Sequence, residues 1–243
     1  MSALTRRHIV ALGLALLPAL GTQAEPPLLR FATDGNDQGG LAPAGRAVLQ
    51  RALERLGRRV RFEPLPLRRS LAMTARGELD GETLRLKSVA DERPELLLVP
   101  VSTATVEVWA YAHDPALMPR TLKDLGGLRV AHQRGIVLLE KLLAGMPGRI
   151  EAATPTDLLR LLRLDAVDVA LLTLAAGQPP LPDSRLAGLY ISPAPLYSAP
   201  LFPLLHGRHG ELLLRLAAVL GEMEASGESA LLRKTAWAQL PAP

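Results

Sequence analysis

The sequence predicts an α/β protein of two lobes, each a mainly parallel sheet flanked by helices, with two hinge crossings between them. Three observations predict this fold class. Strand-like and helix-like segments alternate over residues 28–81, and they alternate again over residues 121–172. The intervening residues 96–111 and the later residues 177–203 resemble extended chain. Such alternation is typical of parallel sheets, which bind ligands at the carboxyl ends of their strands.

The first unit is predicted from apolar spacing and turn formers. Strands are expected over LLRFAT from Leu28, over RVRFEPLPL from Arg59, and around Leu79, where the strand ends in Asp80-Gly81. Helices are expected over residues 43–56 and 69–76, because each has apolar residues at helical spacing and a glycine directly after it. The order strand, helix, strand, helix, strand follows.

The second unit repeats this order. Residues 121–135 predict a short helix, a strand at 128–131 and a polar turn, which opens a helix at 136–143. A helix capped by Thr154 or Thr156 then leads to a buried strand over 167–172. The proline-rich residues 177–203 are expected to cross back as extended chain. Helices over 211–223 and 229–240 are expected to pack on the first unit.

The N-terminus has the layout of a secretory signal peptide. Arg6 and Arg7 precede an apolar run over residues 9–20, and small residues end at Ala24. The run is 12 residues long, whereas about 20 are needed to cross a bilayer. We therefore expect residues 1–24 to be removed and the protein to lie in the periplasm without a membrane anchor. The order Thr5 to Ile9 leaves twin-arginine export open beside the ordinary secretory route.

Charge and composition narrow the function classes. Loss of residues 1–24 removes two arginines and leaves 26 basic against 24 acidic residues, a charge of about +2. This scattered, near-neutral balance gives no reason to expect nucleic acid as a partner. The chain has no cysteine, which excludes disulfides, thiolate metal sites and a lipid anchor on Cys. Aromatic residues make up 3%, which is low for a site that stacks sugar rings.

No motif indicates catalysis, a metal or a cofactor. The five histidines do not form a compact ligand pattern, and His206 and His209 have only Glu211 as a close acid. The sequence contains neither a Gly-x-Ser-x-Gly elbow nor a phosphate-binding Gly-Lys-Ser loop. We therefore expect no cofactor, no metal and no catalytic constellation.

Three segments, in this order, resemble those of bacterial family 3 extracellular solute-binding proteins, which have the periplasmic-binding-protein type II fold. They are ERLGRRVRFEPLPLRRSLAMTARGELDGETLR at 54–85, TLKDLGGLRVAHQRG at 121–135 and LLRLLRLDAVDVALL at 158–172. The resemblance implies that lobe 1 comprises residues 25–108, lobe 2 residues 109–192, and that residues 193–243 return to lobe 1 with C-terminal helices. It implies capture of an amino acid or an organic-acid-like solute between the lobes.

The resemblance also implies an inner-membrane partner, either an ABC permease or a sensor, and a monomeric protein.

One feature departs from the family's amino-acid-binding pattern. That pattern has Thr-x-x-Arg after the Asp-Gly turn, followed by Phe-Ser-x-Pro-Tyr. Here Glu92-Arg93 precedes PELLLVPVS, which keeps Pro100 and Ser102 and has neither aromatic residue. The chain is more similar to divergent members with Asp-Gly-Glu-x-x-Arg, in which Glu82 and Arg85 follow the turn.

Candidate ligand groups in the first lobe follow predicted strands or open helices. Asp34 and Asn36 could accept an ammonium or hydroxyl group, or they could simply form a turn. Arg85 could bind a carboxylate through two parallel hydrogen bonds, or it could be a solvated surface arginine. Arg69 opens a predicted helix, where a cation is unfavourable to the helix dipole, so a functional reason for it is plausible.

In the second lobe, Arg134-Gly135 precedes a predicted helix whose free N–H groups could bind an anion, although turn chemistry alone also explains the glycine. Thr173 ends a predicted buried strand and could face the cleft or lie at the sheet's edge.

Two alternatives to solute capture stay open at this point. The type II fold also occurs in cyclohexadienyl dehydratases, and an enzyme of that kind would use Glu82 and Asp34 as its carboxylates. The other alternative is an adaptor whose cleft binds no ligand and whose surface binds a protein.

Overall fold

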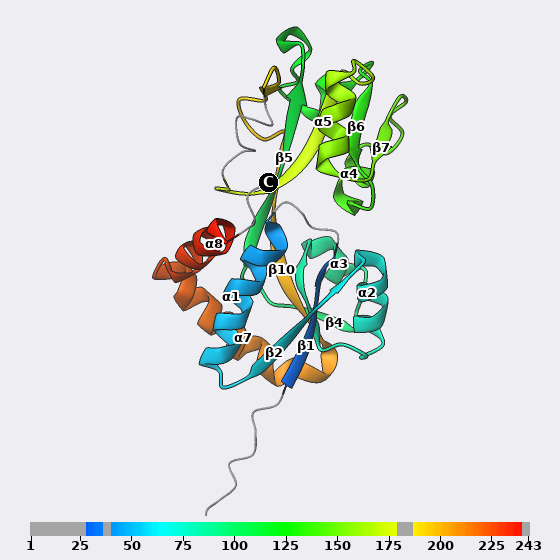
Figure 1. Cartoon of the computed structure of the whole chain (residues 1–243). Helices are drawn as coiled ribbons and strands as arrows, with labels where there is room; N and C mark the ends of the chain where they lie inside the picture. The colour runs from blue at the N-terminus through cyan, green and yellow to red at the C-terminus, as the bar shows by residue number, and fades with distance from the viewer. Residues whose placement is uncertain (1–27, 36–39, 179–186, 240–243) are drawn as a thin grey trace, which may run out of the picture.

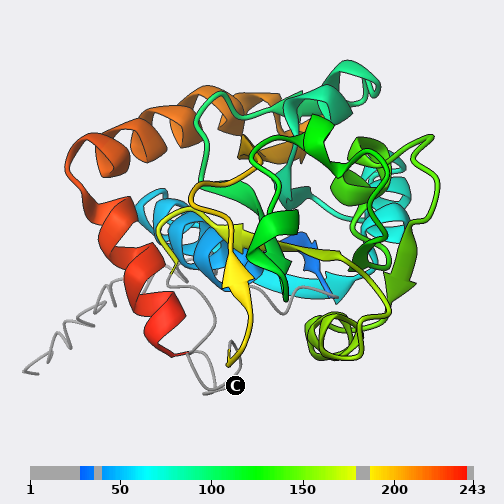
Figure 2. The same ribbon diagram turned by 90° about the horizontal axis from the view of Figure 1, so that it is seen from above.

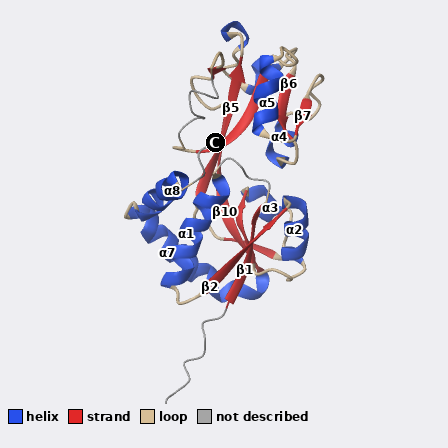
Figure 3. Cartoon of the chain, in the orientation of Figure 1, coloured by secondary structure: helices blue, strands red, loops and turns tan. Residues whose placement is uncertain are grey.

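The computed structural model describes residues 28–35, 40–178 and 187–239. The predicted signal peptide and Asn36 lie outside these ranges. The described chain forms two α/β lobes, one above the other in Figure 1, and Figure 3 shows that each has strands between helices. The strands form one path in the order β2-β1-β3-β10-β5-β8-β6-β7. Within the described ranges, no helix is both long and apolar enough to cross a membrane.

The first lobe contains the sheet made of the first three strands. β1 (Leu28–Asp34) lies between β2 (Arg59–Leu65) and β3 (Gly81–Arg85) and is parallel to both. The short β4 (Leu96–Leu98) pairs with β10 (Tyr197–His206), which runs antiparallel to β3. Helices of this lobe are α1 (Leu41–Arg55), α2 (Leu67–Ala75), α3 (Lys87–Asp91), α7 (Gly210–Ala225) and α8 (Glu228–Ala238). A 3₁₀ turn at Gly207–His209 joins β10 to α7.

The second lobe has its own sheet and two helices. Its strands are β5 (Ala104–Ala112), β6 (Val130–Gln133), β7 (Ile150–Ala152), β8 (Val169–Ala175) and β9 (Tyr190–Ile191). Its helices are α4 (Val137–Leu142) and α5 (Pro155–Arg163), with 3₁₀ turns at Pro115–Leu117 and Leu122–Leu125. Successive β8 residues face opposite sides, so Leu171 packs in the cluster with α4 and Leu172 in the cluster with α5.

The two lobes are joined by β5 and β10. Residues 197–201 of β10 pair with β5, and the rest of β10 pairs with β3 and β4 of the first lobe. This strand contains Pro200 and Pro203, although prolines are rare inside sheets because they have no N–H group to donate. Pro203 still accepts a hydrogen bond from Val99 through its carbonyl oxygen. Figure 1 shows β10 running between the two lobes, and Figure 2, viewed from above, shows α8 beside α1. The lobe boundaries expected at residues 108 and 192 stay predictions.

Several predicted element boundaries are wrong, and two of them in the first lobe concern candidate site residues. The strand expected around Leu79 begins only at Gly81, and it runs to Arg85. A Cβ on Gly81 would lie 2.4 Å from the Leu204 carbonyl oxygen, so the close approach of β10 requires glycine there. The helix expected from Arg69 begins at Leu67, directly after Pro66. Arg85 is therefore the last residue of a strand, and Arg69 lies inside the first turn of α2.

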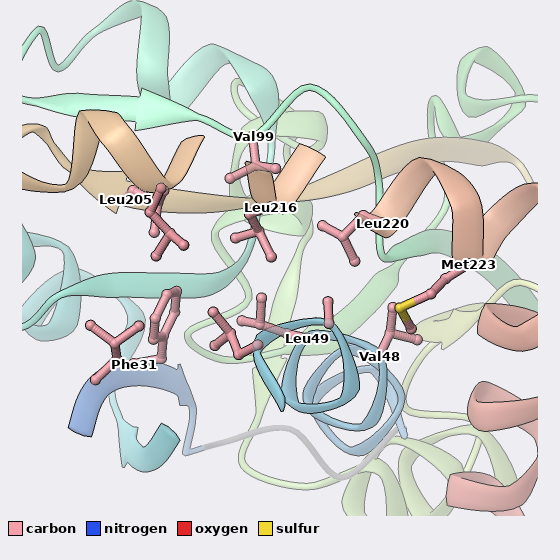
Figure 4. Packing of buried hydrophobic residues seen from close by; sticks show 12 residues of the cluster. Phe31, Val48, Leu49, Val99, Leu205, Leu216, Leu220 and Met223 are labelled. Atoms are coloured by element: carbon pink, nitrogen blue, oxygen red, sulfur yellow. The ribbon is translucent and has the colours of Figure 1, made fainter. Parts of the chain in front are cut away.

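The core of the first lobe joins distant segments of the chain. Phe31 of β1 and Leu49 of α1 pack with Leu216 and Leu220 of α7, as Figure 4 shows, and all four are buried. Helix α7 thus completes a core that the N-terminal segments begin, because its apolar face packs against α1 and the sheet.

Asp80 ties the start of β3 to β1 and to the turn before α7. Its Oδ2 accepts a 2.7 Å hydrogen bond from the Arg30 N–H, and its Oδ1 lies within hydrogen-bond distance of Arg208 and His209. Burial favours the neutral carboxyl, but the hydrogen bonds from Arg30, Arg208 and His209 outweigh it and lower the pKa of Asp80.

Asp80→Asn should therefore make the protein less stable by about 1–3 kcal/mol at neutral pH, because it removes charge-assisted hydrogen bonds. A lowered native pKa gives stability that is present above the unfolded pKa of about 3.9 and is lost as the pH falls through the native pKa. Urea unfolding at neutral and acidic pH should show the difference shrinking below about pH 4. Asp91→Asn, at an exposed position in the same lobe, is the control and should change little at either pH.

Leu216→Ala should lower the free energy of unfolding by about 2–5 kcal/mol, because it leaves a cavity in the core of the first lobe. Leu214→Ala makes the same change on the same helix, but Leu214 is 77% exposed, so a change within about 0.5 kcal/mol is expected. Equal losses in the two variants, measured by denaturant unfolding, would show that α7 does not complete this core.

Candidate functional site

A cleft of about 470 Å³ lies between the two lobes. The first lobe lines it with residues of β1, α1, α2, β3 and α3, and the second lobe with residues of α4, β5 and β8. Figure 1 shows α4 of the upper lobe opposite α2 and α3 of the lower lobe. The ends of β1 and β3 both contribute, through Asp34 and Arg85, because parallel strands place their carboxyl ends at one edge of the sheet.

A buried ion pair forms the floor of the cleft. Arg85 donates from Nε (3.0 Å) and Nη2 (2.7 Å) to Oε2 of Glu82, and the two side chains are 8% and 3% exposed. Residues three apart on a regular strand point to opposite faces. Here β3 has a bulge opposite β10, since the four residues from Glu82 to Arg85 face only the three from Phe202 to Leu204. The bulge allows the two charged side chains to meet.

Helix α2 completes the hydrogen bonds of this pair. Ser70 accepts from Arg85 Nη2 at 2.6 Å and lies 3.3 Å from Glu82 Oε2. Thr74 donates to Glu82 Oε1 at 2.8 Å, and the Leu67 carbonyl accepts from Arg85 Nη2 at 2.9 Å. Both oxygens of Glu82 are therefore engaged. Ser70 and Thr74 were not predicted as site residues, although their spacing of four residues places both hydroxyls on one helix face.

Two ion pairs connect the lobes at the mouth of the cleft. Arg68 of α2 lies 3.2 Å from Glu140 of α4, and Lys141 of α4 lies 3.9 Å from Glu92 beside α3. We call these the mouth pairs. Adjacent residues of α4 thus meet opposite charges on the first lobe. No sequence signal singled out Glu140 or Lys141, whereas Glu92 was noted only as part of the Glu-Arg dipeptide.

The walls of the cleft are mainly aliphatic. Its lining includes Leu84, Val106 and Leu201 beside the hinge strands and Ile136 and Leu138 from the second lobe. The lining has no aromatic side chain among the described residues. Dispersion and burial of aliphatic groups therefore dominate the contacts that the walls can make.

Four of the eight predicted site residues line the cleft: Asp34, Glu82, Arg85 and Thr173. Thr173 lies within β8, which continues for two residues beyond it, to Ala175. Asn36 is outside the described residues. Roles in ligand binding stay predictions for all of them.

The other three predicted residues lie beside the cleft rather than in its lining. Arg69 follows Arg68, which does line it. Arg134 forms an ion pair with Glu151 at 3.2 Å and is largely exposed. Gly135 has φ of 81° and directly precedes Ile136, so the turn requires a glycine and also positions a lining residue.

Among the described residues, no group of three or more His, Cys, Asp or Glu side chains is placed so that it could hold a metal ion. Thr33 is buried in β1 at the cleft, and its Oγ1 has no hydrogen-bond partner among the described residues. A buried hydroxyl without a partner is unfavourable, so this position suits a ligand or water that can bond to it.

Comparison with known proteins supports the fold. No family model matches the chain. An uncharacterized protein of Shewanella oneidensis is 26% identical over 186 residues, which are 74% of this chain and 70% of that protein.

Solved structures match almost the whole chain. A histidine kinase sensor domain with similarity to periplasmic binding proteins is 20% identical, covers 90% of this chain and 99% of its own, and has a TM-score of 0.63. The GluR0 ligand-binding core in complex with L-glutamate is 12% identical, with coverage of 88% and 99% and a TM-score of 0.68. A Streptococcus pneumoniae amino acid ABC transporter substrate-binding protein bound to L-arginine is 14% identical, with coverage of 86% and 94% and a TM-score of 0.63.

These likenesses confirm the predicted fold class. The chain has the two-lobed fold of type II periplasmic binding proteins. Identities this low show the fold alone, so the ligands of these proteins do not carry over to this chain.

Removing the mouth pairs with Glu140→Gln and Lys141→Met should move the two lobes of the ligand-free protein apart. Each exposed ion pair stabilises the contact between the lobes by about 0.2–1 kcal/mol, and the double variant loses both pairs. Small-angle X-ray scattering should show a larger radius of gyration than for the unaltered protein. Salt near 0.5 M should expand the unaltered protein in the same way and leave the double variant unchanged. Glu151→Gln, which breaks an ion pair within one lobe, is the control. Scattering curves independent of both salt and substitution would contradict this role.

Proposed function

We propose that this protein is a periplasmic solute-binding protein that captures a small polar solute in the cleft between its lobes. The observation that supports it most strongly is the cleft itself, which receives its lining from both lobes and contains buried polar groups at its floor. A pocket of a few hundred Å³ with mainly apolar walls and a few polar groups is typical of small-molecule sites. Two crossing strands between the lobes suit hinge closure around the solute.

Solute capture fits the floor of the cleft better than catalysis does. An acid or base in an enzyme of this fold would be Glu82 or Asp34. Both oxygens of Glu82 already accept hydrogen bonds, from Arg85, Ser70 and Thr74, and these bonds hold the carboxylate in its charged, paired form rather than as a free acid or base. Asp34 also has an interaction within the protein. The three solved structures named above are a sensor domain, a ligand-binding core and a transporter substrate-binding protein, and this supports capture over catalysis.

The partner of the loaded protein would be an inner-membrane ABC permease or a membrane sensor. Proteins of similar fold include a transporter substrate-binding protein and a histidine kinase sensor domain, so either class of partner is compatible with the fold. The periplasmic location rests on the signal peptide expected at residues 1–24.

The test is a thermal-shift screen of the purified protein with amino acids, organic acids, polyamines and uncharged aliphatic compounds. A solute that binds only the folded state stabilises it by about 2.7 kcal/mol at one hundred times its dissociation constant. For a chain of this size that corresponds to a rise in Tm of roughly 5–10 °C.

Thr173→Trp should abolish the shift, because the indole would occupy the cleft. Thr156→Trp is the matched control on an exposed position of α5 in the same lobe, and it should leave the shift intact. A protein whose Tm responds to none of the four classes would not be a solute-binding protein.

A further inference from the structure

We infer that the solute is an uncharged, largely aliphatic molecule with a hydrogen-bond acceptor, such as an amide or carbonyl oxygen, that meets the guanidinium of Arg85. This inference rests on the proposed function and names the class of solute. Such a solute differs from the L-glutamate and the L-arginine bound in two of the solved structures of similar fold.

The positive charges in the lining of the cleft are already compensated. Each cationic side chain in the described lining already lies within 4 Å of a carboxylate: Arg85 with Glu82, Arg68 with Glu140, Lys141 with Glu92, and Arg93 with Glu95. A solute carboxylate would therefore meet no uncompensated positive charge there. At the floor it would also lie close to the Glu82 carboxylate, which repels it.

Burial at the floor of the cleft disfavours a charged solute. The Arg85–Glu82 pair is almost fully enclosed, whereas the mouth pairs lie in contact with water. Removing a charged group from water is costly unless an opposite charge compensates it. A neutral oxygen loses much less on entering such a site and needs only a donor. The floor therefore selects against solutes with a full charge on the buried end.

One nitrogen of the Arg85 guanidinium is available to donate a hydrogen bond to the solute. Within the described chain Arg85 donates hydrogen bonds from Nε and Nη2, and none from Nη1. A guanidinium has five N–H groups, so Nη1 can still donate to an oxygen in the cleft. Thr33 adds a hydroxyl that has no partner in the described part of the chain. These groups match one or two acceptors, not an ionised head group.

The walls of the cleft favour an aliphatic solute. Aliphatic side chains from both lobes, among them Leu84, Val106, Ile136 and Leu138, surround the space above the floor. Since no aromatic side chain lines it in the described residues, a ring gains no stacking partner. Each CH₂ group buried against these walls should strengthen binding about fourfold.

The experiment compares solutes of one carbon skeleton and different head groups. Isothermal titration of the purified protein with hexanamide, hexanoate and hexylammonium should give the tightest binding for hexanamide, by at least about tenfold, a difference of about 1.4 kcal/mol. Butanamide should bind more weakly than hexanamide by about sixteenfold, because it lacks two CH₂ groups.

Glu82→Gln tests the cause. The substitution keeps the shape of the side chain and leaves the charge of Arg85 uncompensated, so the preference should move at least about tenfold towards hexanoate. Glu151→Gln, outside the cleft, should leave the preference as it is. If Glu82→Gln does not fold, the preference measured on the unaltered protein decides by itself.

The outcomes separate the class of solute from the function. Hexanoate or hexylammonium binding as tightly as hexanamide would overturn the inference, and so would a charged amino acid that binds while the neutral series does not. Both results would leave solute capture standing. A protein that binds no small solute of any charge would overturn the proposed function together with this inference.

Discussion

Strand β10 is the constraint on which the rest of the structure depends. Its first half pairs with β5 of the second lobe, and its second half pairs with β3 and β4 of the first lobe. One strand therefore forms backbone hydrogen bonds with the sheets of both lobes. Its close approach requires glycine at position 81, and its pairing imposes the bulge on β3. The same strand fixes where α4 lies relative to α2 and α3, and so it determines the cleft.

The bulge in β3 links the fold to the chemistry of the cleft. It allows Glu82 and Arg85 to meet, and α2 supplies the hydroxyls that make the buried pair tolerable. A buried pair gains little over apolar side chains, but loss of one partner costs several kcal/mol, because the other charge is then left without compensation. The pair thus joins α2 to β3 and makes the floor electrically neutral. Electrostatic attraction for charged solutes is weak at such a floor.

The regular elements were predictable because they depend on local spacing. The helix expected over residues 43–56 is observed as α1, and the helix expected over 211–223 is observed within α7. Prediction was wrong where a neighbouring strand determines the backbone. Nothing local around Leu79 shows that β3 begins later, at Gly81, because the reason is the carbonyl of Leu204, which lies far away in the sequence.

The sequence by itself determined the two α/β units, the extended segments between them and the residue types available at strand ends. It placed Asp34, Glu82, Arg85 and Thr173 near the cleft, and Asp34 and Arg85 lie there at the carboxyl ends of β1 and β3, which share one edge of the sheet. Only the tertiary structure decided which charges are already paired. Arg68 meets Glu140 from 72 residues away, and Arg85 meets Glu82 only through a bulge. Local periodicity encodes which face of an element is apolar, whereas charge compensation depends on contacts that exist only once both lobes have folded and met.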